Sequence, residues 1–177
     1  MMTHRTGIAL LTRLALLAVA AVLIAFPRVV KPADANSDDT EIRNYRLTMD
    51  KIQKAANATE AIGKLLAANP TLKKQMDEEN GNSQTIDQSV KFLDTKCPQC
   101  SEVIKSNGLT THEYIVVSFA FIRDTMMVGM KKEGMIKDYP PNSITPENAT
   151  FIEQNFDKLK DLAVKMAPAP NSTPNSK

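Results

Sequence analysis

Two cysteines separated by two residues form the motif with the clearest chemistry, Cys97-Pro98-Gln99-Cys100. Cysteines at this spacing can close a small disulfide or exchange thiols with a substrate. Pro98 suits the first turn of a helix, which would place the Cys97 sulfur where the helix dipole lowers the pKa of a thiol. The motif therefore predicts either a structural disulfide or a redox pair at Cys97 and Cys100.

The surroundings of this motif favour the structural disulfide. A thioredoxin-type site needs a strand before the motif, and we predict none there. Covalent haem attachment needs a histidine directly after the second cysteine, where this chain has Ser101. Structural zinc would need two more ligands, and beyond residue 35 the chain offers no further cysteine and one histidine, His112. We therefore expect no metal and no cofactor.

Three methionines, Met126, Met127 and Met130, form a second cluster. Thioether sulfurs are soft ligands that could bind copper(I) together with the two cysteines. The simpler interpretation is that these side chains fill gaps in a helical core. His112 falls in the first turn of a predicted helix, so we expect it to be solvated rather than a haem ligand. Because nucleophile elbows, phosphate-binding glycine loops and HExxH sequences are all missing, we expect no enzyme.

In the segments that position these side chains, the apolar residues recur at helical spacing throughout. Thr48 is a predicted N-cap, and capping boxes begin at Thr85 and Thr110. Gly108 stands just after a helix, at the position that favours a left-handed backbone. The helices that we predict cover residues 47–69, 70–79, 85–93, 98–107, 110–132 and 145–166.

The most apolar stretch of this region runs from Tyr114 through Met130 and predicts one long, nearly fully buried helix over about 110–132. The break between Leu93 and Pro98 could be a kink within one longer helix. We predict an all-α bundle of five to six helices packed around the central helix. The helical domain is expected to cover 47–166, followed by a disordered tail over 167–177.

The first 35 residues have the features of a signal peptide. Basic residues precede an uncharged apolar run from Leu14 to Phe26, which is short for crossing a bilayer. Ala33-Asp34-Ala35 then places small residues at the positions that signal peptidase recognises, so we predict cleavage between Ala35 and Asn36 and a loose segment over 36–46. The alternative is a membrane anchor in which residues 1–35 are retained.

The charge of the chain excludes one class of partner. The formal net charge is +2, and it becomes −1 once the predicted signal peptide, with its four basic residues and one acid, is removed. A near-neutral exported protein is a poor candidate for binding nucleic acid, and membrane contact would come only through an uncleaved signal segment. We expect a periplasmic or secreted protein.

Three segments give the chain a resemblance to a group of exported proteins of Gram-negative bacteria. They are Leu47-Thr48-Met49-Asp50-Lys51-Ile52, Gly108-Leu109-Thr110-Thr111-His112-Glu113-Tyr114 and Ile144-Thr145-Pro146-Glu147-Asn148-Ala149-Thr150-Phe151-Ile152. The resemblance implies export and helices, and it carries over no activity and no functional residue.

These observations lead to two functional hypotheses of different classes. The first is a non-enzymatic helical domain that binds a protein or a small apolar ligand in a groove between helices. The alternative is a thiol-redox or copper-handling protein that uses Cys97 and Cys100.

Overall fold

The computed structural model describes residues 32–79 and 85–166, and within these ranges the chain forms seven helices and no strand. The helices are α2 (Pro32–Asn44), α3 (Met49–Ala68), α4 (Pro70–Glu79), α5 (Ile86–Lys96), α6 (Pro98–Ser106), α7 (Thr111–Lys132) and α8 (Pro146–Met166). The all-α prediction is therefore confirmed. Most of the predicted signal peptide and the whole predicted tail lie outside the described residues.

Three helices begin at the threonines that the sequence marks as caps. The hydroxyl oxygens of Thr48, Thr85 and Thr110 accept hydrogen bonds from backbone N–H groups three residues later, at 3.4, 3.1 and 3.0 Å. Each bond satisfies one of the amides that a helix leaves unpaired in its first turn. These local rules set the starts of α3, α5 and α7.

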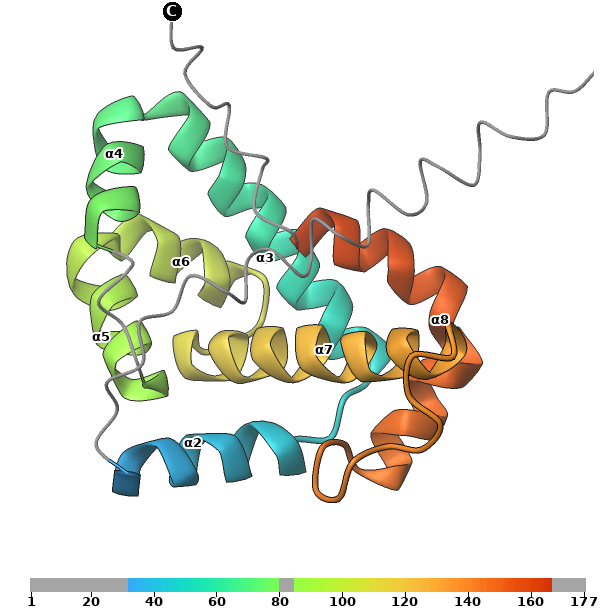
Figure 1. Cartoon of the computed structure of the whole chain (residues 1–177). Helices are drawn as coiled ribbons and strands as arrows, with labels where there is room; N and C mark the ends of the chain where they lie inside the picture. The colour runs from blue at the N-terminus through green and yellow to red at the C-terminus, as the bar shows by residue number, and fades with distance from the viewer. Residues whose placement is uncertain (1–31, 80–84, 167–177) are drawn as a thin grey trace, which may run out of the picture.

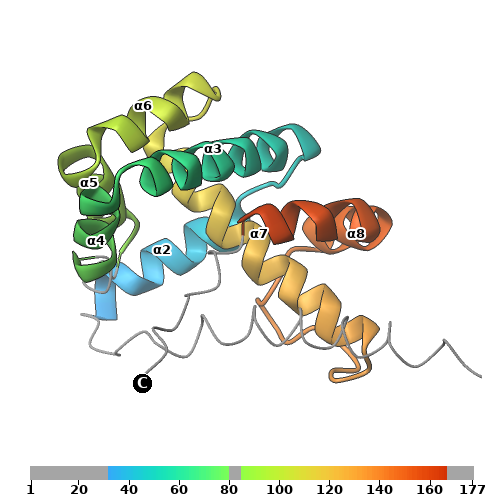
Figure 2. The ribbon, with the colours of Figure 1, turned by 90° about the horizontal axis from the view of Figure 1, so that it is seen from above.

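Helix α7 is the centre of the fold, as predicted (Figure 1). It contacts α2, α3, α5, α6 and α8. In both ribbon views α4, α5 and α6 gather at one end of the molecule and α8 lies at the other (Figure 2). The largest fully buried side chains come from four of these helices and are Ile52, Ile104, Phe121, Ile152 and Leu159.

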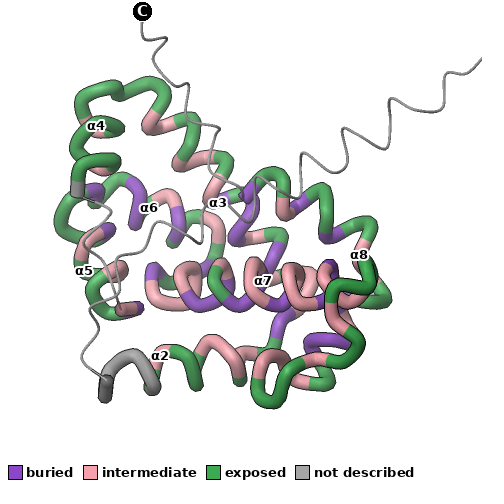
Figure 3. The backbone as a smooth tube through the Cα atoms, in the orientation of Figure 1, coloured by how far each residue is buried: buried purple, intermediate pink, exposed green. Residues whose placement is uncertain are grey.

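The burial of α7 is less complete than the sequence suggests. Buried positions alternate with half-buried ones along the helix, as Figure 3 shows, and Phe119 remains 41% exposed. Val116, Val117 and Ala120 are buried at helical spacing on the side that meets the other helices. The neighbouring helices cover this side more fully than the one that carries Phe119, so an apolar sequence here does not mean a helix enclosed all round.

Helix α2 is the main difference from the prediction, because it occupies most of the segment 36–46 that we expected to be loose. With it the described residues form seven helices, one more than the five to six that we predict. The predicted cleavage bond between Ala35 and Asn36 lies within the bounds of α2. Polar contacts hold it: the Asp38 carboxylate accepts from the Ile86 N–H at 2.8 Å. Such partners, distant in the sequence, stabilise a helix that has no apolar periodicity of its own.

The break between α5 and α6 is a true helix end and not a kink within one helix. Cys97 stands between them, as the C-cap of α5 and the N-cap of α6. Among the described helices, none combines the length and the apolar character needed to cross a bilayer.

Candidate functional site

The predicted cysteine pair forms a disulfide in the interior of the fold. The two sulfur atoms are 2.00 Å apart, and both Cys97 and Cys100 are 0% exposed. The Cys97 sulfur also accepts a hydrogen bond from the Cys100 N–H at 3.2 Å. The disulfide therefore ties the first turn of α6 to its own cap, at a place that solvent does not reach.

The structure does not bring the methionine cluster to this disulfide. The N-terminus of α7 lies beside the α5–α6 junction, because Thr111 and Ser101 both donate hydrogen bonds to Asp94 Oδ1, at 3.0 and 2.6 Å. Met126 lies about four helical turns further along α7, roughly 22 Å away at the rise of an α-helix. Met126, Met127 and Met130 are all half-buried. In the described ranges no group of three or more His, Cys, Asp or Glu residues is placed to hold a metal.

His112 lies in the first turn of α7, where the capping box predicts it. Its side chain is 45% exposed, and its Nε2 lies 3.5 Å from Glu41 Oε1 of α2. This contact joins the two helices at the surface. The expectation of a solvated histidine at a helix end is confirmed.

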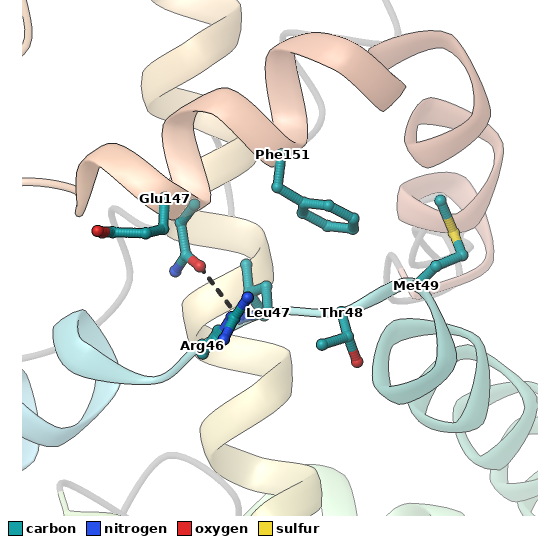
Figure 4. A pocket seen from close by; sticks show the side chains of 7 residues that line it. Arg46, Leu47, Thr48, Met49, Glu147 and Phe151 are labelled. Atoms are coloured by element: carbon teal, nitrogen blue, oxygen red, sulfur yellow. Dashed lines mark hydrogen bonds between the residues drawn. The ribbon is translucent and has the colours of Figure 1, made fainter.

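A small hollow opens between the α2–α3 connection and the start of α8 (Figure 4). Its volume is about 200 Å³. The residues that line it are Arg46, Leu47, Thr48, Met49, Glu147, Asn148 and Phe151. Phe151 projects from α8 toward the connection, and Met49 stands at the first turn of α3. These two half-buried side chains give the hollow apolar walls.

Asn148 forms the floor of the hollow and holds its two sides together. Its Oδ1 accepts a hydrogen bond from the Leu47 N–H at 3.0 Å, and its Nδ2 donates to the Tyr45 carbonyl at 2.9 Å. The same Nδ2 donates to Asp124 Oδ2 at 2.7 Å. Because Asn148 is only 1% exposed, these bonds form away from water and fix the connection against α8.

The other oxygen of Asp124 is bound to the neighbouring Arg123. The Arg123 Nε donates to Asp124 Oδ1 at 3.1 Å, and an η nitrogen of the same guanidinium donates to the Ile42 carbonyl at 3.3 Å. Burial raises the pKa of Asp124, while Arg123 and the Asn148 amide favour its charged form. The buried carboxyl is thus bonded on both oxygens, as a charged group in an interior requires.

A half-buried cluster of Tyr45, Lys51 and Glu113 ties the connection to α3 and α7. The Glu113 Oε1 accepts from the Tyr45 hydroxyl at 2.8 Å and from the Lys51 ammonium at 2.5 Å. The hydrogen bond from Lys51 lowers the pKa of Glu113, and the bond to Glu113 raises the pKa of Lys51 to about 12. The polar groups of these three side chains are hydrogen-bonded to one another, so their role is structural. We call Tyr45, Lys51 and Glu113 the clamp.

Two charged residues on the rim of the hollow differ from those of the clamp. Arg46 and Glu147 are both exposed, and neither has a hydrogen bond or ion pair from its side chain to any described residue. In Figure 4 the Glu147 carboxylate points away from Phe151. The hollow therefore combines apolar walls, a fixed floor and two unpaired charges of opposite sign.

None of the hollow's lining residues was a candidate site residue in the sequence. One signal was readable, because Asp124 is an acid within the most apolar helix, and a buried acid must have partners. Its partner Asn148 comes from α8 and could not be named without the fold.

Comparisons with protein families, with curated proteins and with solved structures find no match to this chain. The resemblance to exported proteins of Gram-negative bacteria stays a prediction.

Proposed function

We propose that this chain is an exported, non-enzymatic binding domain that takes one side chain of a protein partner into the hollow. The observation that carries the proposal is the hollow itself, with Met49 and Phe151 as apolar walls over the fixed Asn148 floor. Apolar pockets with a few well-placed polar groups are the usual form of a binding site.

The size of the hollow favours a protein partner over a small apolar ligand. Pockets that enclose small molecules usually measure about 300–1,000 Å³. At about 200 Å³ this hollow is smaller, and it is open to solvent. Anchor residues of a protein interface insert into depressions of this kind, while the surrounding contacts exclude water.

The disulfide supports export. Cysteine pairs form and persist in oxidising compartments and are rare in the cytosol. Native mass spectrometry of protein from the exported fraction, without reductant, tests this proposal. We expect a chain that begins at Asn36 and has the mass deficit of one disulfide. A chain that retains residues 1–35 would favour the membrane-anchored alternative.

The thiol-redox and copper-handling alternative gains no support from the contacts of the cysteines. Thiol exchange needs a sulfur that a substrate can reach, and both sulfurs are buried. Copper binding would need free thiols close to the methionines.

Site-specific photocrosslinking in the exporting cell tests the binding proposal. A benzophenone amino acid replaces Phe151 in the full chain, and the control places it at Lys158, an exposed residue further along α8. We expect crosslinks to a discrete protein partner from position 151 and none from position 158. Equal crosslinking from both positions, or none from 151, would contradict the proposal.

A further inference from the structure

We propose that the half-exposed apolar side of α7 is the interface of an antiparallel homodimer, in which α7 of one copy packs against α7 of a second copy. This inference goes beyond the proposed function, because it concerns a different face of the molecule from the hollow.

A stripe of apolar side chains runs along α7 and is incompletely covered by the other described helices. Its members follow one another at steps of three or four residues, which places them on one face of the helix. Phe119 is 41% exposed, and the others are half-buried. The stripe extends over about 22 Å at the rise of an α-helix. It consists of Ile115, Phe119, Ile122, Met126 and Met130.

The helices around α7 leave this stripe open to a partner. Helix α2 lies along one border of the stripe, where His112 approaches Glu41 and Arg123 donates to the Ile42 carbonyl. Figure 2 shows that the C-terminal half of α7 extends away from α3, α5 and α6. A continuous apolar stripe at a protein surface is typical of an interaction site.

The stripe and the hollow lie on opposite sides of α7. Asp124 comes two residues after Ile122 and two before Met126, which is about half a turn around the helix from both. The Asp124 side chain is buried and holds the Asn148 floor of the hollow. A second copy on the stripe would therefore leave the hollow free for another partner.

A second copy of the chain fits the stripe because the stripe is complementary to itself. In a two-fold interface each residue meets the counterpart of its own partner. An axis through the middle of the stripe, level with Ile122, makes the two α7 helices antiparallel. It places Phe119 of one copy level with Met126 of the other, and a thioether against an aromatic ring is a favourable contact. Ile115 is likewise level with Met130.

Charge complementarity at the two ends of the stripe favours the antiparallel arrangement. His112 stands three residues before Ile115, and Glu133 stands three residues after Met130. The same axis places His112 of each copy level with Glu133 of the other, so an imidazole donor meets a carboxylate twice. A parallel pair would instead bring like side chains together. Antiparallel helix dipoles also place opposite helix ends side by side.

The size of the stripe indicates a weak dimer. Stable interfaces bury about 800 Å² on each partner, and a stripe one helix wide offers less. We therefore expect a monomer at about 1 µM and a dimer at about 200 µM. Sedimentation velocity of the chain purified from exporting cells, without reductant, measures this equilibrium.

The variant Phe119→Glu tests the place of the interface. It puts a carboxylate into the apolar contact twice, once from each copy, so we expect Kd to rise by about tenfold or more. Phe119 is already exposed to solvent, so the fold should tolerate the change. The matched control is Val164→Glu, the same substitution at an apolar residue of α8 that is 66% exposed. We expect the control to leave Kd unchanged.

A charge exchange tests the antiparallel order. Glu133→Lys should raise Kd by about threefold to tenfold, because two ammonium groups then face the two histidines. The double variant His112→Glu/Glu133→Lys restores opposite charges across the axis and should bring Kd back to that of the parent chain. Both residues are solvent-accessible, so neither change disturbs a buried contact.

Three results would overturn the inference: a chain that stays monomeric at about 200 µM, a dimer that Phe119→Glu leaves intact, or a double variant that dimerises as weakly as Glu133→Lys. A monomer that floats with phospholipid vesicles through Phe119 would also overturn it, since the stripe would then meet a lipid surface. These outcomes are independent of the proposed function, because crosslinking from position 151 reports on the hollow and sedimentation reports on the stripe.

Discussion

The Asn148 amide should be one of the most costly side chains to remove from this fold. Asn148→Ala leaves the buried Leu47 N–H without its acceptor and takes one donor from Asp124. An unpaired buried N–H costs about 1–3 kcal/mol, and a lost hydrogen bond to a charged group about 1.5–3 kcal/mol. We therefore expect a loss of about 3–5 kcal/mol in the free energy of unfolding.

A second substitution at the same position tests whether the Asp124 contact is responsible. Asn148→Asp keeps an oxygen for the Leu47 N–H but replaces the donor at Asp124 Oδ2 by a second carboxylate. Two carboxylates at hydrogen-bond distance cannot both ionise cheaply, whereas one shared proton restores a bond between them. Asn148→Asp should therefore recover more stability than Asn148→Ala as the pH falls from 7 toward 4, because only Asn148→Asp gains a new bond when the shared proton binds, whereas Asn148→Ala gains only from protonation of Asp124 itself.

Urea unfolding followed by far-ultraviolet circular dichroism measures both effects, at pH 7 and in acid. The matched control is Asn155→Ala on the same helix, because within the part of the chain that the structure describes the Asn155 side chain bonds only to the nearby Phe151 carbonyl. We expect the control to change the free energy of unfolding by less than about 1 kcal/mol. A cost below 1 kcal/mol for Asn148→Ala, or the same response to pH in both Asn148 variants, would refute the reasoning.

Three further predictions concern the disulfide, the clamp and a turn. The double variant Cys97→Ala/Cys100→Ala should lower the free energy of unfolding in urea by about 2 kcal/mol, because the disulfide no longer restricts the entropy of a short loop in the unfolded chain. An unchanged free energy of unfolding would mean that the disulfide does not constrain the unfolded chain. The hydrogen bond from Lys51 lowers the pKa of Glu113 below its ordinary value of 4.5, so the stability that this contact contributes is present above that pH and is lost as the pH falls through the folded pKa. Glu113→Gln should therefore unfold more easily at pH 7 and approach the parent stability in acid, and a constant difference across an acid titration would exclude this linkage. Gly108 has φ +80°, so Gly108→Ala should destabilise the fold by about 1 kcal/mol through backbone strain. Gly63 lies in open space on α3, so Gly63→Ala should stabilise the fold slightly. Thermal melts that rank the two variants the other way would contradict this prediction.

Local signals in the sequence were enough to predict most of the helices. A threonine cap or the glycine after α6 acts within four residues of the chain, so its effect does not depend on the rest of the fold. The predicted 110–132 helix matches α7 (Thr111–Lys132) for this reason. The disulfide was also readable, because its two cysteines are three residues apart.

Helix α2 could not be predicted in the same way. Its sequence is polar and has no apolar stripe, which is the pattern of a loose segment. The bonds that hold it join Asp38 to α5 and the Ile42 carbonyl to Arg123 of α7, across 48 and 81 residues of sequence. Only the assembled fold brings such partners together.

The hollow depends on the same kind of distant contact. Asp124 within an apolar helix implies a partner, but nothing in the sequence favours Asn148 over the other polar residues of the chain. Once that bond forms, the Asn148 amide donates its second hydrogen to the Tyr45 carbonyl, and its oxygen accepts from the Leu47 N–H. The α2–α3 connection must therefore lie against α8. The buried acid on α7 thus determines where the connection runs, and the connection provides one wall of the hollow and the Arg46 rim. Under the proposed function, a substitution that frees Asp124 from Asn148 should therefore weaken crosslinking to a partner from position 151, even though neither residue belongs to the rim.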